Sequence, residues 1–215
     1  MCIRDSPEGF SVLNSFETSS RLGGANSGVI SQDNFLYVFK GNSITTVTGD
    51  LNTGQFQIDT LSDEGIGCLA ASSLEEVNGQ IWFLSRKGIY AVSQGSVVEK
   101  SSPLKPLFDN RSYTALRTTS VNWIEERVVL FSLSTMRTVA GEVICDKEET
   151  QVLCYDLETD AWTIWTNIDM TAGVSLDLDE LWMAGTFVSP AGTPIRTNFE
   201  FLELGTNQDL SLIHI

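Results

Sequence analysis

Carboxylates are the most abundant charged side chains in this 215-residue chain, which contains 28 Asp and Glu and 13 Lys and Arg. Asp177 and Asp179 stand close in sequence to Asp169, and two carboxyl groups ~5–10 Å apart could together cleave a glycosidic bond. Spacing along the chain does not set that distance, and solvated carboxylates in turns are much commoner than catalytic pairs. We therefore expect no catalytic residue, and these three are the strongest candidates against that expectation.

Two short motifs resemble ligand-binding loops but lack essential parts. The segment "DLETDA" (156–161) alternates acidic residues like a calcium loop, yet Ala161 stands where the loop needs Gly, and Asn167 where it needs Glu. The segment "GIGCLA" (65–70) matches the dinucleotide pattern GxGxxA, but Asp63 and Glu64 precede it and no long helical pattern follows. Both are predicted to be turns or strand connections, so we expect no metal and no cofactor.

The thiols give no disulfide or zinc framework. Cys68, Cys145 and Cys154 show no CxxC spacing. A bridge between Cys145 and Cys154 across a hairpin is one alternative, and free, buried thiols are the favoured one.

The elements that would have to position these residues are short strands. Each apolar run is rich in β-branched or aromatic residues and is bounded by Gly, Asn, Asp or Ser. A possible helix start at 73–76 runs directly into Asn78-Gly79, a strong hairpin signal, so we expect strand, turn and strand there. The expected strands are 35–40, 44–48, 57–60, 80–85, 89–93, 121–124, 127–133 and 151–157.

The strands recur along the chain. The runs that begin at Leu36 and Ile81 lie 45 residues apart, and a third run begins 47 residues later, at Val128. A fourth begins 53 residues after that, at Leu181, with the extra length assigned to an acidic loop at 141–149. Repeats of this length without helices indicate an all-β fold, a β-propeller with antiparallel blades of about 45–50 residues. Trp82 and Trp162 are expected to lie buried between blades.

The two ends differ from the rest of the chain. "MCIRDS" (1–6) and "LSLIHI" (210–215) resemble translated sequencing-adapter peptides, so we expect both to lie outside the fold. The expected organisation is then a partial propeller of about four blades over 7–209, an incomplete ring because closed propellers have ~4–8 blades. His214 is the single histidine. Because His214 lies in the adapter-like segment 210–215, the rest of the chain has no histidine for imidazole-based catalysis.

The overall charge restricts the kinds of partner. The formal net charge is −15, the mean hydropathy is +0.02 and hydrophobic residues make up 42% of the chain. An acidic surface opposes binding to the phosphates of nucleic acid. Uncharged stretches are too short or too interrupted to span a bilayer, so we expect no membrane anchoring.

Three segments carry a family resemblance. The segment 63–108, which contains "GIGCLA", "NGQIWFLSRKGIYAVS" and a closing "PLF", is similar to the tail nozzle (tail tubular protein B) and related DNA-stabilising hub proteins of short-tailed bacteriophages. "VLCYDLETDAWTIW" (152–165) resembles a later blade of that family, and "FKGNSITTVTGD" (39–50) an earlier one.

The resemblance implies a non-enzymatic structural part of a virion tail, assembled in the host cytoplasm. It further implies a homo-oligomeric ring that contacts the portal, the adaptor and other tail proteins, while DNA passes without specific binding. Two other classes stay open: a cell-surface or periplasmic propeller that binds carbohydrate or protein, and a propeller glycoside hydrolase that uses Asp177 or Asp179.

Overall fold

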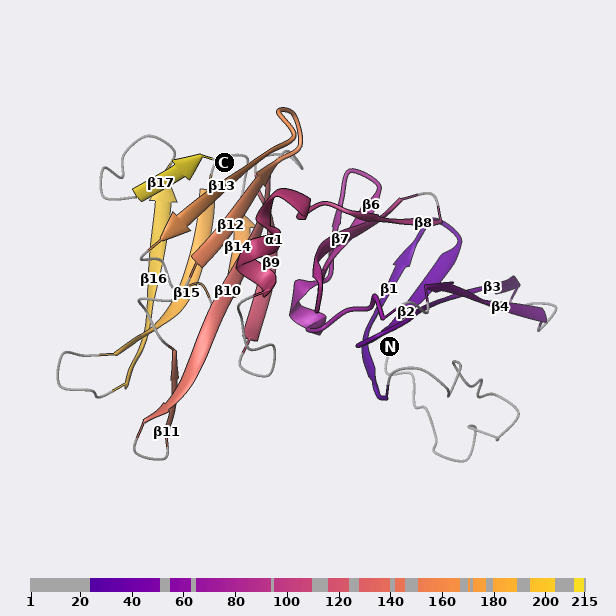
Figure 1. The fold of residues 1–215 in the computed structure, drawn as a ribbon, viewed down its shortest axis with the longest axis horizontal. Coiled ribbons are helices and arrows are strands. Elements are labelled where there is room, and N and C mark those ends of the chain that lie inside the picture. The colour runs from indigo at the N-terminus through magenta and orange to yellow at the C-terminus, as the bar shows by residue number, and fades with distance from the viewer. Residues whose placement is uncertain are drawn as a thin grey trace, which may run out of the picture.

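The computed structural model describes residues 24–50, 55–62, 65–93, 95–109, 116–123, 128–139, 142–145, 151–166, 170, 172–176, 180–188, 194–203 and 211–214. These residues form four antiparallel sheets that follow one another along the molecule (Figure 1). The helical segments among them are single turns, η3 (Ala71–Ser73), η4 (Ser102–Leu104) and α1 (Lys105–Asp109). The all-β prediction is therefore confirmed.

The first and second sheets are four-stranded meanders in which each strand pairs with the next one in sequence. The first sheet consists of β1 (Asn26–Gln32), β2 (Phe35–Lys40), β3 (Ile44–Asp50) and β4 (Gln55–Ser62). The second sheet consists of β5 (Glu75–Val77), β6 (Gln80–Ser85), β7 (Gly88–Ser93) and β8 (Ser96–Glu99).

The third and fourth sheets follow the same up-and-down plan with additions. In the third sheet, β10 pairs with both β9 and β12, β12 pairs with β13, and β11 pairs with the far end of β10. The bounds are β9 (Leu116–Trp123), β10 (Val128–Val139), β11 (Glu142–Cys145), β12 (Gln151–Asp156) and β13 (Ala161–Thr166). The fourth sheet has three strands, β14 (Ala172–Leu176), β15 (Glu180–Val188) and β16 (Pro194–Glu203).

Local sequence explains where the second sheet turns. Asn78 and Gly79 have φ values of 49° and 69°, as a tight hairpin between β5 and β6 requires, and Asn and Gly tolerate that conformation best. The expected strand, turn and strand at this point are confirmed. The possible helix start does not continue as a helix, because η3 ends at Ser73 and Glu75–Val77 already form β5.

The 45-residue repeat is confirmed at the level of strand pairing. Leu36 pairs with Val47 in the first sheet, and Ile81 pairs with Val92 in the second. At the other end of each hairpin, Phe39 pairs with Ile44 and Leu84 pairs with Ile89. The two pairs in between also recur with the offset of 45 residues. Because alternate strand residues point to opposite faces, an identical register places equivalent side chains on the same side of each sheet.

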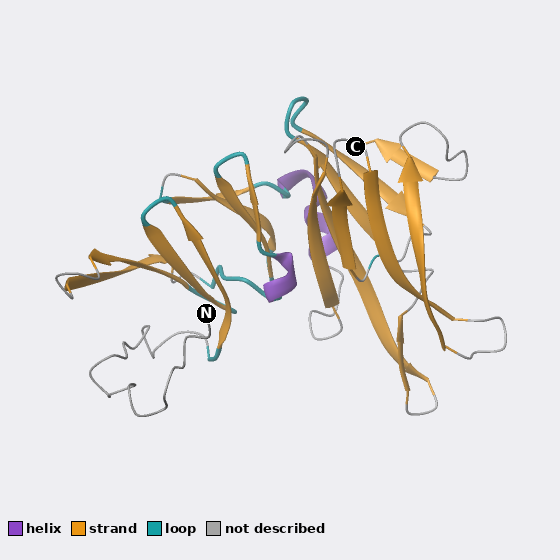
Figure 2. Cartoon of the chain, turned by 180° about the vertical axis from the view of Figure 1, so that it is seen from behind, coloured by secondary structure: helices purple, strands orange, loops and turns teal. Residues whose placement is uncertain are grey.

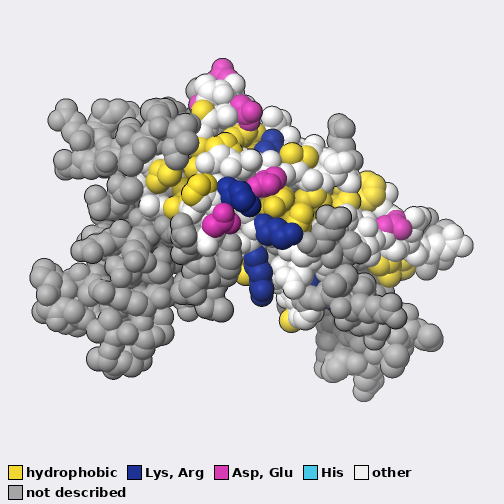
Figure 3. Space-filling model, in the orientation of Figure 1, with side chains coloured by type: hydrophobic (Ala, Val, Ile, Leu, Met, Phe, Trp, Pro, Cys, Tyr) yellow, Lys and Arg dark blue, Asp and Glu magenta, His cyan; other side chains and the backbone are white. Residues whose placement is uncertain are grey.

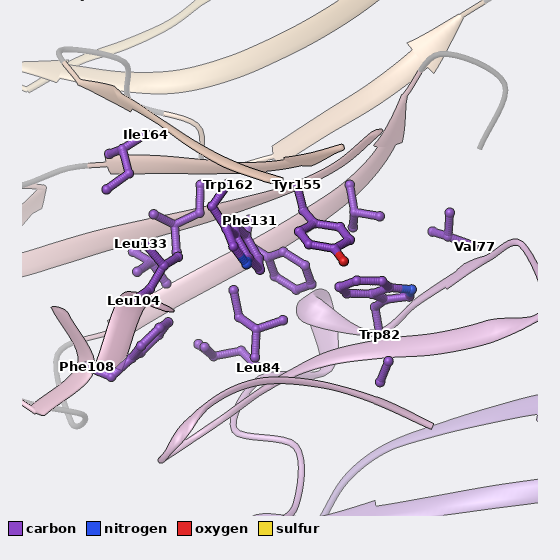
Figure 4. Close-up of a cluster of buried hydrophobic side chains, with 14 residues drawn as sticks. Val77, Trp82, Leu84, Leu104, Phe108, Phe131, Leu133, Tyr155, Trp162 and Ile164 are labelled. Atoms are coloured by element: carbon purple, nitrogen blue, oxygen red, sulfur yellow. The ribbon is translucent and has the colours of Figure 1, made fainter. Parts of the chain in front are cut away.

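The first three sheets pack face to face. Tyr37, Phe39 and Ile44 of the first sheet form one buried cluster with Ile81, Phe83, Tyr90 and Val92 of the second. The other face of the second sheet, with Trp82, Leu84, Ile89 and Ala91, packs against Val129, Phe131 and Leu153 of the third (Figure 4). Figure 2 shows the second sheet between its two neighbours. The second sheet thus buries both faces, which a single meander could not do alone.

The third repeat corrects the expected spacing by one residue. A spacing of 47 makes Val129 the equivalent of Trp82, yet these two residues face each other in the same cluster. Val129 and Phe131 face the preceding sheet, as Ile81 and Phe83 do, so a spacing of 48 is the one that keeps equivalent residues on equivalent faces. A shift of one residue exchanges the two faces of a strand. Because these strands carry apolar residues on both faces, the sequence pattern does not distinguish a spacing of 47 from one of 48.

Two further expectations need correction. The acidic loop expected at 141–149 contains strand β11, because β10 continues to Val139 and forms a hairpin with it. The adapter resemblance predicts that segment 210–215 lies outside the fold, but Ser211–His214 form β17, which pairs with Thr163–Thr166 of β13. Main-chain pairing at a sheet edge needs little sequence specificity, so this pairing does not test where the segment comes from. Residues 1–6 lie outside the described residues.

Candidate functional site

The "GIGCLA" segment joins the first sheet to the second. No strand or helix is assigned to residues 65–70, and only the three-residue turn η3 follows. Gly67 passes against the β2–β3 turn so closely that a Cβ would clash with the carbonyl oxygen of Lys40 and lie 2.6 Å from the backbone nitrogen of Ser43. The glycine is therefore needed for contact between two backbones, and the segment forms the expected connection between strands.

Connecting segments fasten the β6–β7 hairpin from both sides. The backbone N–H of Leu84 donates to the Ser73 hydroxyl at 3.1 Å, and the Leu84 carbonyl accepts from the N–H of Leu69 at 2.7 Å. Across the hairpin, the N–H of Ile89 donates to the Ser101 hydroxyl at 2.8 Å. Both serines are fully buried. They satisfy backbone groups that the hairpin itself leaves unpaired, a role that sequence patterns alone did not reveal.

The "DLETDA" segment is a hairpin turn, as predicted. Asp156 Oδ1 accepts hydrogen bonds from the backbone N–H groups of Glu158 at 2.8 Å and Thr159 at 3.3 Å. Asp160 adopts a φ of 55° and accepts a hydrogen bond from the Tyr155 hydroxyl. Asp156 thus shapes the turn between β12 and β13 through hydrogen bonds to its backbone, and Asp160 through its left-handed conformation. Among the described residues, no group of three or more His, Cys, Asp or Glu could hold a metal ion.

The candidate carboxylates Asp169, Asp177 and Asp179 lie outside the described residues, as does Asn167.

Cys68 and Cys154 are both free thiols, so Cys154 forms no bridge to Cys145. Burial raises the pKa of Cys154 to about 12, with a further contribution from the Asp156 carboxylate. Burial likewise raises the pKa of Cys68, although hydrogen bonds with Ser73 and Ala70 oppose the shift. Both thiols are therefore protonated and unreactive near neutral pH, because the thiolate is the nucleophile.

The contact between the second and third sheets is built from aromatic side chains. The Trp82 ring lies 5.0 Å from Tyr155 and 6.5 Å from Phe131, and Tyr155 lies 4.8 Å from Trp162, all between ring centroids (Figure 4). Trp82 and Trp162 are 0% and 2% exposed. Their predicted burial between sheets is confirmed, and neither ring is available to stack on a ligand from solvent.

Lys100 fixes the edge of this contact. Its ammonium nitrogen lies 5.3 Å from the Trp82 ring centroid and 5.9 Å from that of Tyr155, within the range of cation–π attraction. Its carbonyl oxygen accepts a hydrogen bond of 3.0 Å from Trp162 Nε1. Trp82 Nε1, in contrast, has no hydrogen-bond partner in the described part of the chain. No sequence pattern points to Lys100, because its role depends on how the two sheets meet.

The described surface carries charges of both signs. Figure 3 shows Lys and Arg side chains gathered near the middle of one face, with Asp and Glu beside them. Arg86, Lys87 and Lys105 are among the exposed basic side chains of the described residues. This face is therefore mixed in charge, although the whole chain is strongly acidic.

In the described part of the chain, no helix is long and apolar enough to cross a membrane. Comparison with protein-family models finds no match, and comparison with curated proteins finds no similar sequence.

Proposed function

We propose that this protein is a non-enzymatic structural component of a bacteriophage virion tail, of the nozzle or tail-tube kind, and forms part of the DNA conduit below the portal. Its sheets are the blades of a partial β-propeller of about four blades.

The propeller proposal rests on the matching strand pairs of the first two sheets. Four consecutive cross-strand pairs of the β2–β3 hairpin recur 45 residues later in β6–β7, and the second sheet is covered on both faces by its neighbours. Repeated meanders that each cover the next are the building principle of propellers. The described sheets are open, so the ring itself is part of the proposal.

The structural role draws support from what the family-like motifs do here. "GIGC" provides the close backbone passage at Gly67, and the "FLSRKGIY" hairpin is fastened by Ser73 and Ser101. The segment that ends in "PLF" inserts Leu104 and Phe108 into the core between two sheets. Each motif thus serves contact between sheets, as expected of a part whose function is mechanical.

The proposed assembly is a homo-oligomeric ring in the phage tail that contacts the portal, the adaptor and other tail proteins. DNA passes through it without specific binding, because the net charge of −15 opposes attachment to phosphates. No membrane anchoring is needed. The virion is the proposed location, after assembly in the host cytoplasm.

The deciding experiment images the full-length protein by electron microscopy, alone and mixed with the portal and adaptor of its phage. We expect rings that join the portal–adaptor assembly. A matched mixture without the adaptor shows whether attachment is specific. Failure to join the assembly contradicts the proposal.

The hydrolase alternative has its own assay. Glycan hydrolysis that is lost in Asp177→Asn or Asp179→Asn, and kept in the turn variant Asp160→Asn, would replace the structural function with an enzymatic one. Binding of a surface glycan or protein without hydrolysis would favour the cell-surface propeller.

A further inference from the structure

We draw no further inference here: the strongest candidate, the outward face of the first sheet, on which Val29, Phe56 and Ile58 are exposed, is an apolar sheet face, and nothing in the structure shows what covers it.

Discussion

At the scale of single residues, the two buried tryptophans should both contribute strongly to the stability of the fold. Both fill the contact between the second and third sheets, so Trp82→Ala and Trp162→Ala should each cost roughly 3–5 kcal/mol of unfolding free energy. Phe35→Ala is the control, because Phe35 is 44% exposed and should lose much less. Denaturant unfolding gives the values, and a tryptophan variant as stable as the control would contradict the packing described here.

Replacement by phenylalanine separates packing from hydrogen bonding at the same two positions. Trp162→Phe removes the donor to the Lys100 carbonyl, whereas Trp82→Phe removes an Nε1 that has no partner in the described structure. A net hydrogen bond contributes ~1 kcal/mol, and a buried unsatisfied donor costs free energy. We therefore expect Trp162→Phe to be the more destabilising by about 1 kcal/mol or more. Equal losses would show that Trp82 Nε1 is also bonded.

The Cys154 thiol should make stability depend on pH in the alkaline range. Its pKa is raised to about 12 in the folded chain, from an ordinary value of 9, so the folded state holds the proton more tightly. Its contribution is fully present below pH 9 and is lost as the pH rises toward 12, by at most ~1.4 kcal/mol per pH unit. The difference in free energy of unfolding between wild type and Cys154→Ala should change with pH only in that range. A difference that stays constant between pH 9 and pH 12 would rule out the raised pKa of Cys154.

At the scale of elements, the connection between the first two sheets depends on one glycine. Gly67→Ala would press a methyl group against backbone atoms of the β2–β3 turn, which cannot rotate away as a side chain could. Gly41→Ala, in that same turn, meets nothing within 4 Å and is the matched control. We expect Gly67→Ala to cost about 1–3 kcal/mol and Gly41→Ala to be nearly neutral. Thermal unfolding measures both, and equal melting temperatures would show that the connection tolerates displacement.

The sequence predicted the elements whose signal is local. The bounds of β2 and β6 follow directly from apolar runs between turn residues, and the Asn78-Gly79 hairpin follows from backbone preference. It did not predict β11 or the true register of the third repeat, because both depend on how far β10 extends and which face meets Trp82. The contacts of Ser73, Ser101 and Lys100 were missed for the same reason, since they form between segments distant in sequence.

At the scale of the whole molecule, the terminal segments give two opposed expectations. An adapter-like segment has no co-selected packing partner, so its removal should leave the melting temperature unchanged. Strand β17 instead covers the edge of β13, and removal would bare the backbone groups of that edge. Deletion of 1–6 alone and of 210–215 alone separates the two ends. We expect no change on deletion of 1–6 and, because β17 pairs with β13, a fall in melting temperature on deletion of 210–215. No fall on deletion of 210–215 would show that the segment adds nothing to the fold, as its adapter resemblance implies.

The last prediction concerns the charge of the whole chain and DNA. A protein that binds duplex DNA releases counterions, so its affinity falls linearly with the logarithm of salt concentration. With a net charge of −15 and basic side chains interspersed with acidic ones on the described face, this chain should show no such binding, even at about 50 mM salt, where charges are less screened than at physiological salt. Fluorescence anisotropy of a labelled duplex measures it. The triple variant Arg86→Gln, Lys87→Gln, Lys105→Gln should behave like the wild type, because these exposed side chains are not expected to hold DNA. Salt-sensitive binding that disappears in the triple variant would show that these basic side chains hold DNA despite the overall negative charge.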